Sequence, residues 1–217
     1  YVVAEKILAP FEKLPKDWAI NGTVGYEFLN DVCDLLVNQH NEKKFNRAYQ
    51  KFIGSVTNFN ELVVECKKLI MKTSLTGELN TLSNYLNKIS EKYYSTRDYT
   101  LNGLRDALTE IIACFPVYRT YITEDNKGDK AVDYIKWAVG LAKKRSRSVE
   151  PSIYDFIEKV LLLELVEDKE SQDYQDILQF TLKFQQYTGP LMAKGLEDTS
   201  FYRYNRLVAL NEVGGEP

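Results

Sequence analysis

The sequence has few of the residues that bind metals or build disulfide frameworks. Its 217 residues include one histidine, His40, and three cysteines, Cys33, Cys66 and Cys114. One histidine cannot form a metal cluster, and we expect neither a metal nor another cofactor. The three cysteines are widely spaced among apolar helical positions, where a free thiol packs as a small hydrophobic group. We therefore expect no disulfide framework, and a cytoplasmic location is favoured.

A large charge of one sign and long apolar runs are also missing. The formal net charge is -3, and a nucleic-acid-binding chain would be strongly basic, so no nucleic-acid partner is expected. No apolar run approaches the roughly 18 residues of a membrane span, and no membrane partner is expected. The hydrophobic share of 44% and the charged share of 27% are ordinary for a globular protein. The length suffices for one large domain or two small ones.

The apolar pattern predicts a mainly α-helical chain. From Tyr26 onward apolar residues recur at the three-and-four spacing of a helix seam, over about seven helices. The last long helix is expected to end near Gly189-Pro190, because proline interrupts the helical hydrogen-bond ladder. Strand-like pieces occur only near the N-terminal end, in residues 1–8 and 18–24.

Several local signals mark individual helices. Asn41 is expected to cap a short helix that runs to about Ile53, and Asn58 with Glu61 resembles a capping box. The basic run at 143–147 is expected to be a solvated C-terminal turn, since cations suit that end of the helix dipole. One apolar stripe follows Tyr26 and consists of Leu29, Val32, Cys33 and Leu36.

Glu5 is the candidate catalytic residue. It lies at the carboxyl end of the first predicted strand and is followed by an irregular loop that contains Pro10 and Pro15. In a barrel of parallel strands, catalytic side chains lie at that end, and a carboxyl group there can serve as general acid and base. The alternative is a solvated or ion-paired glutamate without a catalytic role.

The segment from Thr188 to Asn205 is rich in residues that bind sugars. Tyrosines offer flat apolar faces to pyranose rings, and arginine, asparagine and acidic side chains bond to hydroxyls. Residues 202–205 cannot all face one way on a helix. We expect some of them to be core or scaffold, with Arg203 as a buried ion-pair partner.

Several motifs, in order along the whole chain, resemble maltooligosyl trehalose synthases, which are members of the α-amylase superfamily. The motifs that carry the resemblance are Val2–Leu8, Gly22–Leu29, Gly77–Asn80, Phe115–Tyr121, Phe184–Gln186, Gly189–Gly195 and Asn211–Gly215. The departures from the family's pattern are mild, and none removes a group needed for proton transfer. They are Ala4, Val24, Glu27, Leu196 and Ser200.

The resemblance implies a position in the fold for each part of the chain. Glu5 matches the acid/base glutamate after the fifth barrel strand, and Gly22–Tyr26 matches the region of the sixth. The implied fold is mainly α: a helical bundle-like insertion domain, with short strand remnants of a (β/α)8 barrel at the N-terminal end. Residues 1–29 are the expected barrel remnant, 30–183 the helical insertion, and 184–217 a return segment at the active-site rim. Both catalytic aspartates of the family would lie outside this chain.

The implied activity is an intramolecular transglucosylation in trehalose biosynthesis. The reducing-end α-1,4 bond of a maltooligosaccharide becomes an α,α-1,1 bond, so the enzyme is an isomerase. The implied partners are this substrate and the rest of the same polypeptide, and the 217-residue chain alone is expected to be inactive.

We expect Lys194, Glu197, Asp198 and Tyr202 to lie near the substrate. For Glu197 and Asp198 the alternative is that they begin a helix at its positive end. Phe115–Tyr121 is expected to be mainly structural. Two other functions stay open at this point: a free-standing helical binding or scaffold module, and part of an α-glucan hydrolase.

Overall fold

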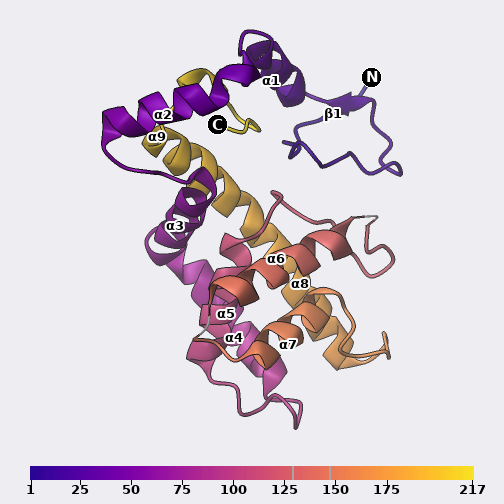
Figure 1. Ribbon diagram of the computed structural model, residues 1–217. Coiled ribbons are helices and arrows are strands. Elements are labelled where there is room, and N and C mark those ends of the chain that lie inside the picture. The colour runs from indigo at the N-terminus through magenta and orange to yellow at the C-terminus, as the bar shows by residue number, and fades with distance from the viewer. Residues whose placement is uncertain (129, 147) are drawn as a thin grey trace. The chain divides into compact units, whose positions relative to one another are not determined.

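The computed structural model describes residues 1–128, 130–146 and 148–217 (Figure 1). It confirms a mainly α-helical chain with a two-stranded sheet near the N-terminal end. The described residues form eight helices of nine or more residues, against about seven predicted. None of these helices is both long enough and apolar enough to cross a membrane.

The chain divides into two compact units. Unit 1 consists of residues 1–67 and 193–217, and unit 2 of residues 68–192. The boundaries expected near residues 29 and 183 fall inside unit 1 and unit 2 respectively. The division into barrel remnant, insertion and return segment stays a prediction.

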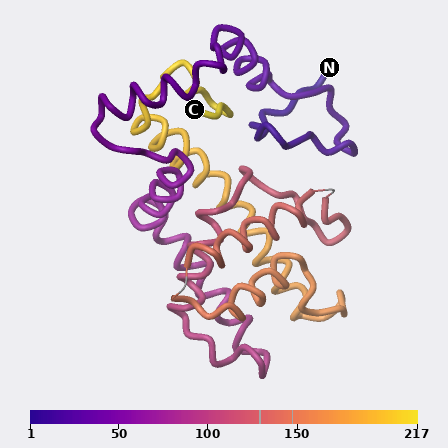
Figure 2. Tube along the Cα trace, in the orientation of Figure 1, coloured from indigo at the N-terminus to yellow at the C-terminus, as the bar shows by residue number. Residues whose placement is uncertain are grey.

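Unit 1 contains the strands, the helices α1, α2 and α9, the first part of α3, two 3₁₀ turns and one π-helix. The C-terminal residues 193–217 belong to unit 1, and Figure 2 shows them beside the helices that follow Tyr26. The elements are β1 (Val3–Ala4), β2 (Gly22–Thr23), α1 (Tyr26–Asp34), the 3₁₀ turn η1 (Gln39–Asn41), α2 (Glu42–Ile53), the first part of α3 (Phe59–Lys72), the π-helix η2 (Ala193–Ser200), α9 (Phe201–Arg203) and the 3₁₀ turn η3 (Val208–Leu210).

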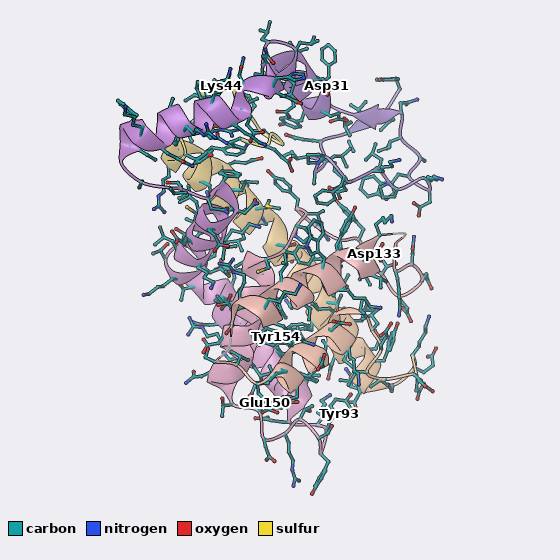
Figure 3. The ribbon with its side chains drawn as sticks, in the orientation of Figure 1. Asp31, Lys44, Tyr93, Asp133, Glu150 and Tyr154 are labelled. Atoms are coloured by element: carbon teal, nitrogen blue, oxygen red, sulfur yellow. The ribbon has the colours of Figure 1, made fainter. Side chains whose placement is uncertain are left out.

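Unit 2 is a helical cluster around one apolar core. α4 packs on α5 and α8, and α7 packs on α5, α6 and α8. Tyr154 is among its largest fully buried side chains, and Figure 3 shows it between these helices. The elements are the end of α3, α4 (Thr76–Ser90), α5 (Leu101–Ala113), α6 (Ala131–Arg145), α7 (Pro151–Leu161) and α8 (Gln172–Met192).

The predicted helix starts are largely confirmed. The Asn58 side chain accepts a hydrogen bond from the Glu61 amide at 3.2 Å, as the capping pattern predicts. Asn41 directly precedes α2, but its side chain makes no capping bond there. Asn38 instead caps η1 by accepting from the His40 amide at 3.1 Å. The side-chain cap is therefore Asn38, three positions before the predicted Asn41, because the 3₁₀ turn η1 leads directly into α2.

The last long helix ends two residues past the predicted Gly189-Pro190, so that Pro190 lies inside it. α8 contains Pro190 and continues to Met192, where η2 follows directly. Proline removes one ladder bond and crowds the preceding turn, but both sides of it are anchored in unit 2. The Tyr187 hydroxyl donates to the Leu75 carbonyl at 3.1 Å, and Leu191 and Met192 are buried. Tertiary packing outweighs the local preference of proline to end a helix.

The three cysteines are free thiols, as predicted, and Cys66 and Cys114 are buried. Cys33 is half-buried, because the apolar stripe of α1 is largely exposed in this chain. Val32 is 42% and Leu36 89% exposed, and α1 has no buried residue.

The basic run forms the last turn of α6, which ends at Arg145, and Lys143 forms an ion pair with Asp155. Arg147 lies outside the described residues.

Candidate functional site

The strand pair β1–β2 determines where Glu5 lies. The strands are parallel, with Val3 opposite Gly22 and Ala4 opposite Thr23. Strands that run parallel end at the same edge of a sheet. Glu5 follows β1 directly, so its side chain lies at the same edge as the turn that follows β2. This is the position at which barrel enzymes carry catalytic groups.

The turn after β2 brings α1 to this edge. Gly25 has a φ of 99°, which glycine adopts without the steric cost of a Cβ atom. The Thr23 hydroxyl accepts a hydrogen bond from the Gly25 amide at 3.2 Å and donates to the Glu27 carboxylate. The chain therefore reverses within three residues, and α1 begins at Tyr26.

Tyr26 and Glu5 meet at the edge. The Tyr26 hydroxyl donates to Glu5 Oε1 at 3.2 Å, while the Glu5 carboxylate is exposed. This hydrogen bond and the negative charge of Glu5 raise the pKa of the Tyr26 phenol, with smaller contributions from desolvation and from the charge of Glu197. Tyr26 therefore keeps its proton and stays a donor. Glu197 belongs to the same electrostatic environment.

A buried ion pair supports the chain immediately after Glu5. Lys6 Nζ lies 2.7 Å from Glu12 Oε1, and their side chains are only 4% and 6% exposed. Glu12 Oε2 also accepts the Ala9 amide at 3.2 Å. The Lys6 side chain is buried, whereas Glu5, one residue earlier, is exposed. The pair holds the loop that follows β1 and hence the backbone of Glu5.

The C-terminal segment of unit 1 packs against the start of α1. Asn30 Nδ2 donates to the carbonyls of Tyr26 and Val213, both at 2.9 Å. A Cβ atom at Gly215 would lie 2.6 Å from the Leu210 carbonyl oxygen and 2.9 Å from Asn30 Oδ1. Only glycine fits there without movement of the backbone, so the C-terminal segment can lie close to Asn30 of α1.

Three of the four predicted sugar-binding residues lie on a π-helix that the sequence did not predict. The Thr199 hydroxyl donates to the Lys194 carbonyl and the Ser200 hydroxyl to the Gly195 carbonyl, both at 2.7 Å. These bonds span five residues, as the backbone bonds of a π-helix do, and π-helical turns are frequent at functional sites. Thr199 and Ser200, each five residues after the residue whose carbonyl it binds, are the local signal that the sequence offered.

The four predicted sugar-binding residues differ in their exposure and in their contacts. Glu197 is half-buried and lies near enough to Tyr26 to influence its pKa. Lys194 and Asp198 form an exposed ion pair at 3.8 Å on η2. Tyr202 is 79% exposed. Glu5 and Tyr26 are thus brought together, and the substrate roles of all four predicted residues stay predictions. Tyr26 was missed because only the parallel pairing of two distant strands brings it to Glu5.

The prediction that Arg203 is a buried ion-pair partner is wrong. Arg203 is exposed, and its guanidinium donates to Cys66 Sγ at 3.3 Å. Phe201 at the start of α9 and Tyr204 directly after its end are both buried. Phe59 contacts both rings, with centroids 6.1 and 5.1 Å away. Their burial turns Arg203 toward the surface.

Replacing Gly195 by alanine should destabilise unit 1. A Cβ atom there would lie 2.7 Å from Lys67 Cγ and 3.0 Å from Lys67 Cα on α3. Relief requires a shift of η2 or α3, and overpacking of this kind costs about 1–3 kcal/mol. Urea unfolding of the full chain measures the loss. The matched control is Gly140→Ala, where nothing lies within 4 Å. That variant should gain about 0.5–1 kcal/mol from helix propensity, and equal stability of the two variants would contradict the prediction.

No family model matches this chain. A putative maltooligosyl trehalose synthase from Mycobacterium tuberculosis is 26% identical over 217 residues, which are all of this chain and 25% of that protein. The solved structure of a maltooligosyltrehalose synthase from Arthrobacter ramosus superposes with a TM-score of 0.77 at 30% identity. A glycosyltrehalose synthase structure gives a TM-score of 0.68, also at 30% identity.

These matches cover nearly all of this chain but a small part of its relatives. Both structures match 99% of the chain, which spans 24% of the Arthrobacter ramosus protein and 22% of the other. The superpositions leave out only about 1% of the chain. The resemblance that the sequence motifs predicted is confirmed: along its whole length, this chain is similar to about one quarter of a maltooligosyl trehalose synthase.

Proposed function

We propose that this chain is the part of a trehalose-forming transglucosylase that carries its general acid and base, Glu5. The observation that carries the proposal is the position of Glu5 at the carboxyl edge of a parallel strand pair, hydrogen-bonded to Tyr26. The end-to-end similarity to maltooligosyl trehalose synthases supports it. Two strands cannot close an eight-stranded barrel, so the rest of the barrel would come from the same polypeptide.

The proposed chemistry is that of a retaining glycosidase with a sugar as acceptor. An aspartate outside this chain attacks the anomeric carbon of the penultimate glucose unit, while Glu5 protonates the departing glycosidic oxygen. The released glucose stays bound and turns. Glu5 then removes the proton from its anomeric hydroxyl, and that oxygen attacks the glycosyl intermediate. One α-1,4 bond breaks, one α,α-1,1 bond forms, and no water is consumed.

We further propose that η2 and α9 contribute to binding the maltooligosaccharide. Lys194 and Asp198 expose charged groups that can bond to hydroxyls, and the Tyr202 ring is exposed enough to stack on a pyranose face. The negative charge of Glu197 contributes to the raised pKa of Tyr26, after the larger effects of Glu5 and of desolvation. The three free cysteines favour the reducing cytoplasm as the location of the polypeptide.

The test is product analysis with the complete polypeptide that contains this chain. Incubation with maltopentaose should remove reducing ends while releasing little glucose, and it should give a non-reducing product of unchanged mass. Glucose and shortened maltooligosaccharides would instead indicate an α-glucan hydrolase. No change in the substrate would favour a helical module without catalysis. The 217-residue chain alone should leave maltopentaose unchanged.

A further inference from the structure

Tyr26 is hydrogen-bonded to Glu5, although proton transfer by Glu5 does not itself require a tyrosine. Its hydroxyl reaches Glu5 Oε1 at 3.2 Å across 21 residues of sequence. We propose that Tyr26 is a positioning residue: it holds one oxygen of Glu5, so that the other faces the glycosidic oxygen. The inference rests on the proposed function of Glu5.

Three local features restrain the backbone of Tyr26. The turn of Thr23 and Gly25 precedes it, the Asn30 amide bonds to its carbonyl at 2.9 Å, and α1 begins at Tyr26 itself. Its phenol therefore projects from a rigid base. Glu5, in contrast, is exposed on a short strand end, where a flexible side chain would sample several rotamers. A donor on a rigid base restricts that freedom, and catalysis is sensitive to such placement.

The hydroxyl is also suited to remain a donor. The hydrogen bond to Glu5 and the negative charge of Glu5 raise the pKa of Tyr26, because a phenolate would lose the bond and be repelled by the carboxylate. The hydrogen bond therefore persists over the pH range in which a carboxyl group can act as acid and base. It joins exposed and half-buried groups, so it adds little to the stability of the fold.

The experiment replaces Tyr26 by phenylalanine in the complete polypeptide. With maltopentaose, kcat should fall about 10-fold and KM should change less than about 2-fold, because orientation for proton transfer is lost and not binding. With α-maltotriosyl fluoride, the burst of fluoride release should keep its rate, since fluoride leaves without a proton from Glu5. The matched control is Tyr49→Phe, which removes a hydroxyl that accepts the Asn205 amide at 3.3 Å. Its kcat should stay at the parent value.

Three outcomes would overturn the inference. An unchanged kcat would show that Tyr26 does not position Glu5. Equal losses with maltopentaose and with the fluoride would show a general defect of the site, as would an unfolding midpoint far below that of Tyr49→Phe. The Glu5→Gln variant separates this inference from the proposed function. If Glu5→Gln lowers the rate and Tyr26→Phe does not, only the role of Tyr26 fails. If neither does, the proposed function fails.

Discussion

Changing Glu5 to glutamine in the complete polypeptide should lower kcat on maltopentaose by about 100-fold or more. General acid–base catalysis contributes about 10²–10⁴-fold, and an amide of the same size cannot give up or take the proton. KM should change little, because the shape of the site is kept. The burst of fluoride release from α-maltotriosyl fluoride should survive, since that step needs no acid. Steady turnover of the fluoride should slow, because the second half-reaction still needs Glu5 as base.

The control for this variant is Glu65→Gln. Glu65 is an exposed glutamate on α3 in the same unit, so the change in charge is the same without a change at the strand edge. That variant should keep the parent kcat. If Glu5→Gln formed the non-reducing product at the parent rate, Glu5 would be a solvated glutamate. The alternative that the sequence left open at this position would then be correct.

Much of this fold could be predicted because its signals are local. Three-and-four apolar spacing marks a helix wherever it occurs, and it predicted about seven helices where the described residues form eight of nine or more residues. The Asn58 cap depends on residues three apart. Both strands were placed correctly, but they are only two residues long instead of the seven or eight expected. Their length depends on pairing with neighbouring strands, and the described chain supplies one partner for each.

The parts that could not be predicted depend on contacts between distant residues. Pro190 is a local signal for a helix end, but the buried residues around it in unit 2 keep α8 intact. The π-helix η2 packs closely against α3, where Gly195 approaches Lys67, which lies 128 positions earlier. In the candidate site, motif similarity found Glu5, whereas finding Tyr26 required the register of β1 and β2. Site residues that act through geometry leave no pattern in one sequence.

Two of the sequence motifs, Phe115–Tyr121 and Phe184–Gln186, pack against each other in unit 2. Phe115 and Phe184 pack edge to face, with centroids 5.4 Å apart. Next to them, Gln185 Oε1 accepts the Ile122 amide at 2.6 Å, and Gln185 Nε2 donates to the Ile122 carbonyl at 3.0 Å. The segment 115–122 thus has its backbone bound by a side chain of α8. This supports the structural role that was expected for Phe115–Tyr121.

Replacing Gln185 by leucine should therefore destabilise the chain by about 2–4 kcal/mol. Gln185 is 1% exposed and Ile122 is fully buried, so water cannot replace the lost partner. Each buried backbone group left unpaired costs about 1–3 kcal/mol, and leucine leaves two of them. Urea unfolding of the full chain measures the effect. The same substitution at Gln179, an exposed residue of the same helix, should stay within about 0.5 kcal/mol of the parent. Equal stability of the two variants would show that the Ile122 backbone does not depend on Gln185.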